Sequence, residues 1–496
     1  MEPHSGSIVA AGKVGFSPMN RVDRFAGLAC DSRKVGAGYL FAALPGARAD
    51  GSDFIADAVR RGAIAVLGVP EVCKIAESLG VAFIADANPR QRLARIAATY
   101  FGAQPQTVAA VTGTNGKTSV CVFLRQIWTE LGRKAASMGT IGVVLPASEI
   151  ELEHTTPDPV ALHRLLAQLK DGGVEHLALE ASSHGLDQYR LDGVQIAAAA
   201  FTNITRDHLD YHGDFSHYLA AKLRLFAEVL QPGGLAVINA DADHADEFVR
   251  AAQIRDAELL TVGEHASALK LLSRRAKPDG QGLSVKYLDE KFEITLPLSG
   301  SFQASNALVA AGLAIGLGED AERVFAALGE LRGAPGRLQK VAYAASGASI
   351  YVDYAHTPDA LATVLEAVRP HVEGRLHVVF GCGGDRDSGK RRIMGRIAAR
   401  HADSVIVTDD NPRTEDAATI RTQVLCGCPA AQDIADRAAA IGIAVAALGK
   451  GDALIIAGKG HETGQITGSL VRPFSDADEA VKAARALGGR AAESIA

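Results

Sequence analysis

The sequence predicts an α/β protein with mostly parallel sheets, divided into three domains. Short apolar stretches of strand length alternate along the chain with segments of helical periodicity, which is the pattern of parallel strands joined by crossover helices. The 496 residues exceed what one hydrophobic core usually holds, so about three domains are expected. A glycine-rich loop at 113–118 lies between a predicted strand and a predicted helix, where a phosphate-binding loop belongs.

The first predicted domain, residues 1–105, is a small α/β unit. Its apolar stretches at 38–46 and 62–69 are separated by glycine and charged residues. The pattern changes near residues 104–106, which we expect to mark the boundary.

The second predicted domain spans residues 106–335. It opens with a strand from Thr107, a glycine-rich turn and a helix that runs to about Leu131. Further strands are predicted at 176–182, 196–204 and 234–240, with a helix at 216–230. This alternation predicts a mostly parallel sheet that is covered on both faces.

The third predicted domain, residues 336–496, repeats the alternation of strands and helices. Its apolar runs lie at 348–355, 375–384, 403–410 and 452–460. Each run ends in, or is followed directly by, glycine, aspartate or histidine, the residues expected at the carboxyl edge of a parallel sheet, where ligands bind.

Composition narrows the function classes. A net charge of -6 argues against a nucleic-acid binder held by phosphate contacts. No apolar run approaches the roughly 20 residues that span a bilayer, and the first residues lack a signal-peptide pattern. We therefore expect a cytoplasmic protein that acts on small molecules, without nucleic-acid or membrane partners. Of the six cysteines only Cys426 and Cys428 lie close together, which favours incidental thiols over a zinc site.

The glycine-rich loop predicts a phosphate site. Backbone N–H groups at the start of the helix would meet a phosphate, Lys117 would add positive charge, and the Thr118 hydroxyl suits Mg²⁺. The loop is shorter than the full phosphate-binding motif, because Val111 stands where a glycine is expected. A turn that merely caps a helix is the alternative. The loop alone indicates nucleotide binding and no particular reaction.

Several segments together resemble the Mur ligases. The loop VTGTNGKT is similar to their nucleotide loop, and agreement extends to EASSHGLDQYR (180–190), FTNITRDHLDYHG (201–213), YVDYAHTPDAL (351–361) and the set FGCGGDRD, TDDNPR and AGKGHE. Folylpolyglutamate synthetases share the loop and fold but are not expected to carry this last set. The resemblance covers all three predicted domains.

The resemblance implies a fold and an activity. It implies a small N-terminal α/β domain for the UDP end of the substrate, a central P-loop ATPase domain and a C-terminal Rossmann-like domain. The implied enzyme is a monomer that uses ATP and Mg²⁺ to join meso-2,6-diaminopimelate to the D-glutamate of UDP-N-acetylmuramoyl-L-alanyl-D-glutamate, through an acyl phosphate. Three alternatives stay open: a ligase of the same fold that adds L-lysine, a folylpolyglutamate synthetase-like enzyme, and a nucleotide switch that forms no amide.

For ATP, metal and catalysis, the resemblance implies roles that the residues alone would not show. Taken alone, Glu180 would more often be a solvated residue or a helix cap than a metal ligand, and His208 would be a structural histidine. Lys222 would be a snorkelling lysine on one helix face with Tyr218 and Phe226. The implied catalytic residues are Lys117, Glu180, His208 and Lys222. The implied ATP-binding residues are Gly113, Thr114, Asn115, Gly116, Lys117, Thr118, Ser119, Asn306, Arg337, Asp353 and His356. The implied metal ligands are Thr118, Glu180, His208 and Lys222, the last as a carbamylated lysine (N6-carboxylysine).

For the UDP-linked substrate, the resemblance implies hydroxyls and arginines that suit a sugar–pyrophosphate–peptide ligand. His154, next to the threonine pair, receives no role. The implied residues are Cys30, Ser32, Ala47, Arg48, Ala49, Thr155, Thr156, Ser182, Gln188 and Arg190.

For the amino acid, the resemblance implies a site for diaminopimelate. This compound differs from lysine by a carboxylate on the far carbon, which a bidentate arginine recognises. Arg413 of the DNPR segment is the implied partner of that carboxylate, although DNPR is also an ordinary turn sequence. The implied site comprises Arg386, Asp410, Asn411, Pro412, Arg413, Gly458 and Glu462.

Overall fold

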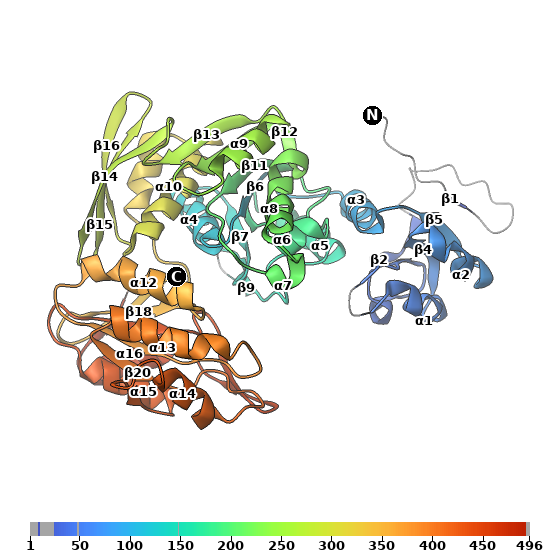
Figure 1. Cartoon of the computed structure of the whole chain (residues 1–496). Coiled ribbons are helices and arrows are strands. Elements are labelled where there is room, and N and C mark those ends of the chain that lie inside the picture. Colours follow the sequence, from blue (N-terminus) through green and yellow to red (C-terminus); the bar gives the residue numbers. More distant parts are fainter. Residues whose placement is uncertain (1–7, 10–23, 47–48, 147, 493–496) are drawn as a thin grey trace. The chain divides into compact units, whose positions relative to one another are not determined.

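The computed structural model describes residues 8–9, 24–46, 49–146 and 148–492. Ala47 and Arg48, expected near the UDP-linked substrate, lie outside the described residues. Figure 1 shows the helices and strands of the chain, coloured along the sequence. The chain divides into two compact units. The first comprises residues 1–117, 132–238 and 242–259, and the second comprises 118–131, 239–241 and 260–496.

The first unit begins with a five-stranded sheet in the order β1-β5-β4-β3-β2. Its strands β2 to β5 are parallel and β1 is antiparallel to β5. The strands are β1 (Ile8–Val9), β2 (Gly27–Ala29), β3 (Tyr39–Ala42), β4 (Ala63–Gly68) and β5 (Ala82–Ala85), with helices α1 (Ile55–Arg60), α2 (Cys73–Ser78) and α3 (Pro89–Phe101). Helix α3 begins where Asn88 accepts a hydrogen bond from the Gln91 N–H and Pro89 occupies the first turn.

A second sheet of the first unit holds the glycine-rich loop. Within this unit its strands run in the order β12-β11-β6-β10-β7-β8-β9, parallel from β12 to β7. They are β6 (Thr107–Thr112), β7 (Ala135–Gly139), β8 (Gly142–Val144), β9 (Glu149–Ile150), β10 (His176–Glu180), β11 (Ile196–Phe201) and β12 (Leu230–Asn239). The helices are α5 (Pro159–Asp171), α6 (Ser183–Asp187), α7 (Leu209–His212), α8 (Phe215–Arg224) with a π-helical turn at Leu225–Val229, and α9 (Ala245–Gln253). The strands and helix predicted in this segment are confirmed, to within a few residues at their ends.

The second unit contains α4 (Lys117–Glu130), apart from its first residue, and an antiparallel meander that the apolar pattern did not predict. Strands β14, β15 and β16 pair antiparallel, whereas β13 and β14 are parallel. Exposed charged residues such as Arg274 and Arg275 break the apolar pattern of β14, and glycine and polar residues break that of β15. The bounds are β13 (Glu258–Gly263), β14 (Leu269–Lys277), β15 (Gly280–Tyr287), β16 (Glu290–Leu296), α10 (Ser301–Gly316) and α11 (Ala321–Leu328).

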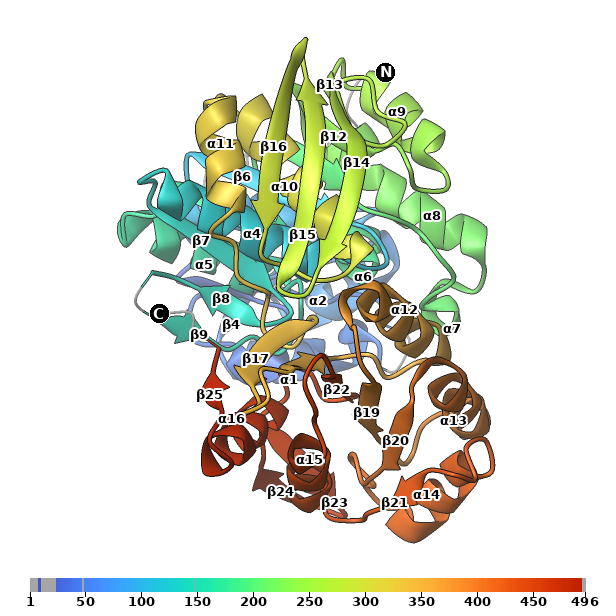
Figure 2. The same cartoon turned by 90° about the vertical axis from the view of Figure 1, so that its left-hand side faces the viewer.

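The last part of the second unit is a seven-stranded sheet in the order β21-β20-β19-β22-β18-β17-β25. It is parallel from β21 to β18, with helices on both faces (Figure 2): α12, α13 and α14 cover one core, and α15 and α16 cover the other. The strands are β17 (Gln339–Tyr343), β18 (Ser349–Asp353), β19 (Leu376–Phe380), β20 (Ser404–Val407), β21 (Gln432–Asp433), β22 (Ala453–Ala457) and β25 (Arg490–Ala491), with a separate hairpin of β23 (Gly464–Thr467) and β24 (Leu470–Pro473). The helices are α12 (Pro358–Val368), α13 (Gly389–His401), α14 (Ala417–Leu425), α15 (Arg437–Ala446) and α16 (Asp476–Ala486).

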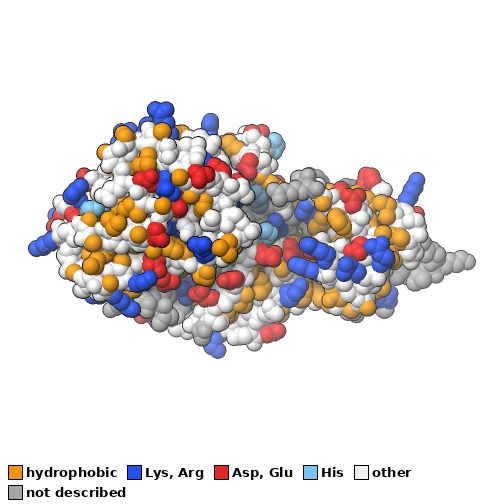
Figure 3. Space-filling view, turned by 90° about the horizontal axis from the view of Figure 1, so that it is seen from below, with side chains coloured by type: hydrophobic (Ala, Val, Ile, Leu, Met, Phe, Trp, Pro, Cys, Tyr) orange, Lys and Arg blue, Asp and Glu red, His pale blue; other side chains and the backbone are white. Residues whose placement is uncertain are grey.

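The surface carries charges of both signs. On the face shown in Figure 3, Lys and Arg side chains are interspersed with Asp and Glu. Within the described ranges, no helix combines the length and apolar character needed to cross a membrane.

A fully buried ion pair joins α15 to α16. The Arg437 guanidinium donates from Nε and Nη2 to the two oxygens of Asp476 at 2.7 Å each, and both side chains are 0% exposed. Arg437 also donates to the carbonyl of Ala457 at the end of β22. The pair therefore fixes two helices to the strand end that precedes Gly458.

We expect Arg437→Leu to destabilise the protein, because it leaves the Asp476 carboxylate buried without its partner. The loss of unfolding free energy should be about 3–5 kcal/mol. Thermal or urea unfolding measures it. The control Lys286→Ala removes an exposed pair with Asp289 and should change stability by less than about 0.5 kcal/mol. Equal effects of the two substitutions would contradict the assignment.

Candidate active site

The glycine-rich loop lies at the carboxyl end of β6, between the ends of β10 and β11. Gly113 has φ +150°, and a Cβ atom there would lie 2.0 Å from the Thr202 hydroxyl and 2.9 Å from the Asn203 carbonyl oxygen. Only glycine fits this approach. Gly116 also has a positive φ, of 88°.

Residues after β11 hold the loop in place. The Asn115 N–H donates to the Asn203 side-chain oxygen at 3.0 Å, and the Asn203 amide donates back to the Asn115 carbonyl at 3.1 Å. The Thr202 hydroxyl donates to the same carbonyl at 2.6 Å. The loop is thus shaped before any phosphate binds, so its N–H groups need little reorganisation.

Two lysines converge on one carbonyl of the loop. Lys117 Nζ donates to Gly113 O at 2.9 Å, and Lys222 Nζ donates to the same oxygen at 2.7 Å. Lys222 is 1% exposed, and burial, followed by repulsion from Lys117, holds the pKa of its amine well below the ordinary value. An amine in this environment is readily neutral, and therefore nucleophilic.

The predicted face of α8 is confirmed. Tyr218, Lys222 and Phe226 are all buried, and Lys222 Nζ lies 4.6 Å from the centroid of the Tyr218 ring. The Tyr218 hydroxyl lies 2.9 Å from the Thr114 hydroxyl. Tyr218 therefore links the loop to the helix that carries Lys222.

Glu180 ends β10 with its carboxylate buried. It is 1% exposed, and its two oxygens accept hydrogen bonds from the Thr140 N–H at 2.8 Å and the Thr140 hydroxyl at 3.1 Å. The Thr140 hydroxyl also lies 3.2 Å from that of Thr155. The expected metal ligand and an expected substrate residue thus share one neighbour.

His208 differs from the buried Glu180 in being partly exposed to solvent. It has φ +51°, precedes α7, and is half-exposed, with its ring packed edge-on to His184 at 4.9 Å between centroids. Within the described part of the chain no three His, Cys, Asp or Glu side chains form a ready metal site.

The residues expected to bind the UDP-linked substrate form a hydrogen-bonded group beside Glu180. The Thr156 hydroxyl donates to Glu180 O and lies 2.9 Å from that of Ser182. Arg190 donates to Thr156 O at 2.5 Å and to Gln188 Oε1 at 2.8 Å, and burial lowers its pKa. An arginine that is partly desolvated binds an anion more strongly than an exposed one.

Three described residues of the N-terminal segment are also expected to contact the UDP-linked substrate. Ser32 is buried, Cys30 is half-buried, and Ala49 is exposed. Burial, followed by the charge of Asp158, raises the pKa of the Cys30 thiol to about 12. The thiol therefore stays protonated at neutral pH and is not a nucleophile.

In the second unit, the expected nucleotide residues are connected. The Asn306 amide donates to Gln303 Oε1 at 3.3 Å, and the Gln303 amide donates to Arg337 O at 2.9 Å. The Arg337 guanidinium lies 4.8 Å from the centroid of the Tyr354 ring. Residues far apart in sequence thus meet where β18 ends.

Asp353 and His356 follow from the end of β18. The Asp353 carboxylate accepts from the Leu338 N–H at 2.6 Å and the Ala355 N–H at 2.7 Å, while burial raises its pKa. His356 Nδ1 lies 2.9 Å from the Tyr354 carbonyl oxygen, and burial lowers the pKa of its ring. Asp353 thus anchors the segment that carries Arg337.

The residues expected to bind diaminopimelate lie at one edge of the seven-stranded sheet. Arg386 follows β19, Asp410 to Arg413 follow β20, and Gly458 and Glu462 follow β22, and these three strands are parallel neighbours. The carboxyl ends of parallel strands meet at one edge, so the prediction that these segments come together is confirmed.

The DNPR loop is braced by the hairpin of β23 and β24. The Arg413 N–H donates to Ile466 O at 3.1 Å, and the Gly468 N–H donates to Arg413 O at 2.6 Å. The Arg413 guanidinium donates from Nη1 to Gly384 O at 2.8 Å. Arg386, two positions after Gly384, is exposed. Asn411 is 4% exposed and its amide bonds to protein groups.

Sequence reasoning missed several residues that shape the site. Ligands gather beyond the carboxyl ends of parallel strands, and this rule could have identified Thr140 after β7 and Thr202 and Asn203 after β11. Nothing in the pattern marked Tyr218 as a partner of the loop, and Lys459 was passed over within a segment already singled out. The missed residues are Thr140, Thr202, Asn203, Tyr218 and Lys459.

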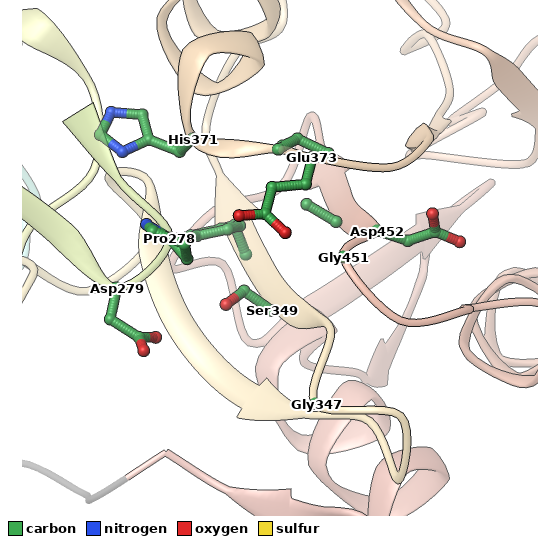
Figure 4. A pocket seen from close by; sticks show the side chains of 11 residues that line it. Pro278, Asp279, Gly347, Ser349, His371, Glu373, Gly451 and Asp452 are labelled. Atoms are coloured by element: carbon green, nitrogen blue, oxygen red, sulfur yellow. The ribbon is translucent and has the colours of Figure 1, made fainter.

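A small pocket in the second unit is lined by none of the expected site residues (Figure 4). Its His371 ring bonds to Lys277 O and to the Gly300 N–H, and the Asp452 carboxylate accepts from the N–H groups of Arg375 and Gly449. These polar groups already have structural partners.

Comparisons with known proteins agree with this geometry. The Mur ligase family, catalytic domain, matches residues 24–101; the Mur ligase middle domain matches 111–314; and the Mur ligase, glutamate ligase domain, matches 336–460.

Two curated relatives carry the name UDP-N-acetylmuramoyl-L-alanyl-D-glutamate--2,6-diaminopimelate ligase. The protein from Bradyrhizobium diazoefficiens is 55% identical, over 93% of this chain and 94% of its own. The protein from Caulobacter vibrioides is 53% identical, over 92% and 95%.

Solved structures give the same result. One of a protein with that name has 35% identity and a TM-score of 0.71, covering 93% of this chain and 95% of its own. A MurF ligase from Thermotoga maritima in complex with ADP shares the fold, with a TM-score of 0.60 at 19% identity over 94% and 98% of the two chains. The chain belongs to the Mur ligase family.

Proposed function

We propose that this protein is the ATP-dependent ligase that joins meso-2,6-diaminopimelate to the D-glutamate of UDP-N-acetylmuramoyl-L-alanyl-D-glutamate, a step in making peptidoglycan precursor. The observation that carries the proposal is the set of DNPR, GGDRD and GKGHE segments at one sheet edge, in a chain 55% identical to a relative of that name. ATP and the UDP-linked substrate are cytoplasmic compounds, which supports a cytoplasmic location for the enzyme. We further propose that it acts as a monomer.

The domain boundaries support a division of labour. We assign residues 1–105 to the UDP end of the substrate, 106–335 to ATP, and 336–496 to the amino acid. Each of the three family matches falls within one of these segments, at 24–101, 111–314 and 336–460.

The reaction needs an activated carboxyl group. The D-glutamate carboxylate attacks the γ-phosphorus of ATP, ADP leaves, and an acyl phosphate forms. The amine of diaminopimelate then adds to the carbonyl carbon, and the tetrahedral intermediate releases inorganic phosphate and a proton to give the amide. Negative groups come together in both steps, so the protein contributes mainly positive charge and the positioning of the reactants.

The loop residues are suited to the ATP phosphates. The N–H groups of Gly113 to Ser119 at the start of α4 would receive them, and Lys117 would exchange its internal bonds to Gly113 O and Thr114 O for phosphate oxygens. Asn306, Arg337, Asp353 and His356 would contact the rest of the nucleotide. Arg337 carries the positive charge among these.

The donor set fits Mg²⁺ in part. The Thr118 hydroxyl and the buried Glu180 carboxylate are oxygen donors of the kind that this ion prefers, with phosphate oxygens completing its shell. His208 supplies a nitrogen, and Lys222 becomes an oxygen donor once carbamylated. Bound there, Mg²⁺ would neutralise charge on the transferred phosphoryl group.

The surroundings of Lys222 support the proposal that it is carbamylated. A neutral amine adds to CO₂ and releases one proton, which turns a group that repels Mg²⁺ into a carboxylate that binds it. Lys222 is buried beside Lys117, which favours loss of its positive charge.

The UDP-linked substrate would bind the hydroxyl and arginine group next to Glu180. Thr155, Thr156, Ser182, Gln188 and Arg190 offer directional donors beside the carboxylate expected to hold the metal. Ser32 and Cys30, with residues 47–49, would contact the UDP end.

The amino-acid site would recognise a carboxylate and an ammonium group on the same carbon. Arg413 and Arg386 supply positive charge, while Asp410 and Glu462 supply negative charge at the same sheet edge. Lysine lacks the far carboxylate and would leave an arginine without its anion.

Purified protein with ATP, Mg²⁺ and the UDP-muramoyl dipeptide should release phosphate and form tripeptide only when diaminopimelate is added. Phosphate release and product mass measure this for diaminopimelate, lysine and glutamate in turn. Product with lysine but not diaminopimelate would overturn the amino-acid assignment. Phosphate release without any amino acid would favour the nucleotide-switch alternative.

Arg413→Ala should raise the KM for diaminopimelate by roughly 10- to 100-fold, since it removes one charge-assisted contact. Initial rates at varied diaminopimelate, with ATP saturating, measure this change. The control Arg392→Ala removes an exposed arginine on α13 and should leave the KM unchanged. An unaltered KM in Arg413→Ala would exclude the proposed carboxylate contact.

Lys222→Ala should nearly abolish turnover, and added acetate should restore part of it by supplying the missing carboxylate. In the wild type, ¹³C-labelled bicarbonate should give a carbamate signal by NMR that is lost on acidification, because the protonated amine cannot hold CO₂. Lys170→Ala, which removes an exposed lysine of α5, serves as the control. Full activity without Lys222 would contradict the role.

A further inference from the structure

Lys459 is a charged side chain with no role in the proposed reaction so far. It lies between Gly458 and Gly460 on the loop after β22, and its side chain is 0% exposed. Lysine is almost never fully buried unless it is paired, because burial of an ammonium group is costly. The cost calls for an explanation in terms of its partners.

Both partners of Lys459 belong to the expected amino-acid site. Its Nζ donates to Asn411 Oδ1 at 3.1 Å and to Glu462 Oε2 at 3.0 Å. The Asn411 amide nitrogen donates to the same Glu462 oxygen at 2.9 Å, which closes a ring of three side chains. The Ile466 N–H donates to Asn411 Oδ1 at 3.0 Å, so the hairpin fixes the orientation of the amide.

The ring leaves one oxygen of Glu462 open. Oε2 accepts both hydrogen bonds, whereas Oε1 makes none with the residues that the structure describes, and the side chain is 34% exposed. The two hydrogen bonds to Oε2 hold the Glu462 carboxylate in one orientation. An ionised oxygen held in a fixed direction at a sheet edge is suited to an ammonium group.

We propose that Lys459 is a positioning residue for the amino-acid substrate: it orients Glu462 so that Oε1 receives an ammonium group of a diamino acid. The inference rests on the proposed function, because it assigns a recognition element within that same site. It differs from a purely structural role, in which Lys459 would stabilise the loop without affecting substrate affinity.

The test compares Lys459→Met, which keeps the length of the side chain and removes the charge, with Lys482→Met. Lys482 also pairs with a glutamate three positions away, Glu479, but its side chain is 75% exposed and lies on α16. Steady-state kinetics give kcat and the KM for each of the three substrates, and thermal unfolding reports stability. We expect Lys459→Met to raise the KM for diaminopimelate on the order of 10- to 100-fold and to leave the KM for ATP unchanged, while Lys482→Met changes neither.

A double-mutant cycle separates positioning from stability. If Lys459 acts through Glu462, Lys459→Met added to Glu462→Gln should raise the KM for diaminopimelate little beyond the larger single effect. Independent, multiplying effects would overturn the proposal, as would a lower melting temperature with an unchanged KM. Should Lys459→Met not fold, Lys459→Gln keeps a donor without the charge and should show the same rise in KM.

The wild-type reaction distinguishes failure of the proposed function from failure of the proposed role of Lys459. Wild-type protein that forms no tripeptide with diaminopimelate contradicts the proposed function itself. Wild-type protein that forms it, alongside a Lys459→Met variant of unchanged KM, contradicts only the role of Lys459.

Discussion

Two lysine side chains in the first unit donate to a single backbone carbonyl, and the neighbouring groups are arranged around that crowded point. Lys117 and Lys222 both donate to Gly113 O, at 2.9 and 2.7 Å. Close positive charges in a buried place repel strongly unless an anion enters or one of them loses its proton. Phosphate would relieve the repulsion for Lys117, and carbamylation would relieve it for Lys222. The proposed chemistry would thus relieve the repulsion that the closeness of Lys117 and Lys222 creates in the protein alone.

Parallel sheets supply the rest of the arrangement. Neighbouring strands β10, β6 and β11 end together, which brings Glu180, the phosphate-binding loop and Asn203 to one edge. In the second unit, β18, β22, β19 and β20 do the same for the segments expected to bind nucleotide and amino acid. Each sheet therefore collects charged groups from distant parts of the chain at one edge.

Most of this fold, and the grouping of the expected site residues, could be predicted from apolar runs and from the resemblance to Mur ligases. The antiparallel strands β14 to β16 could not, because exposed charges break the apolar pattern in β14 and β16, and glycine and polar residues break it in β15. Tyr218 and Lys459 were missed for another reason: their importance lies in side-chain contacts with distant segments, such as that of the Tyr218 hydroxyl with Thr114. A one-dimensional pattern carries no information about such contacts. The individual roles of the site residues remain predictions.

The left-handed backbone of Arg413, with φ +51°, costs a residue other than glycine about 1 kcal/mol or more. Two backbone hydrogen bonds to the β23–β24 hairpin, from Arg413 N–H and to Arg413 O, offset that cost. The conformation of the loop is thus maintained from outside the seven-stranded sheet. Shortening or loosening this small ribbon would let the arginine relax to ordinary torsion angles, and under the proposed role of Arg413 this change would weaken recognition of the far carboxylate.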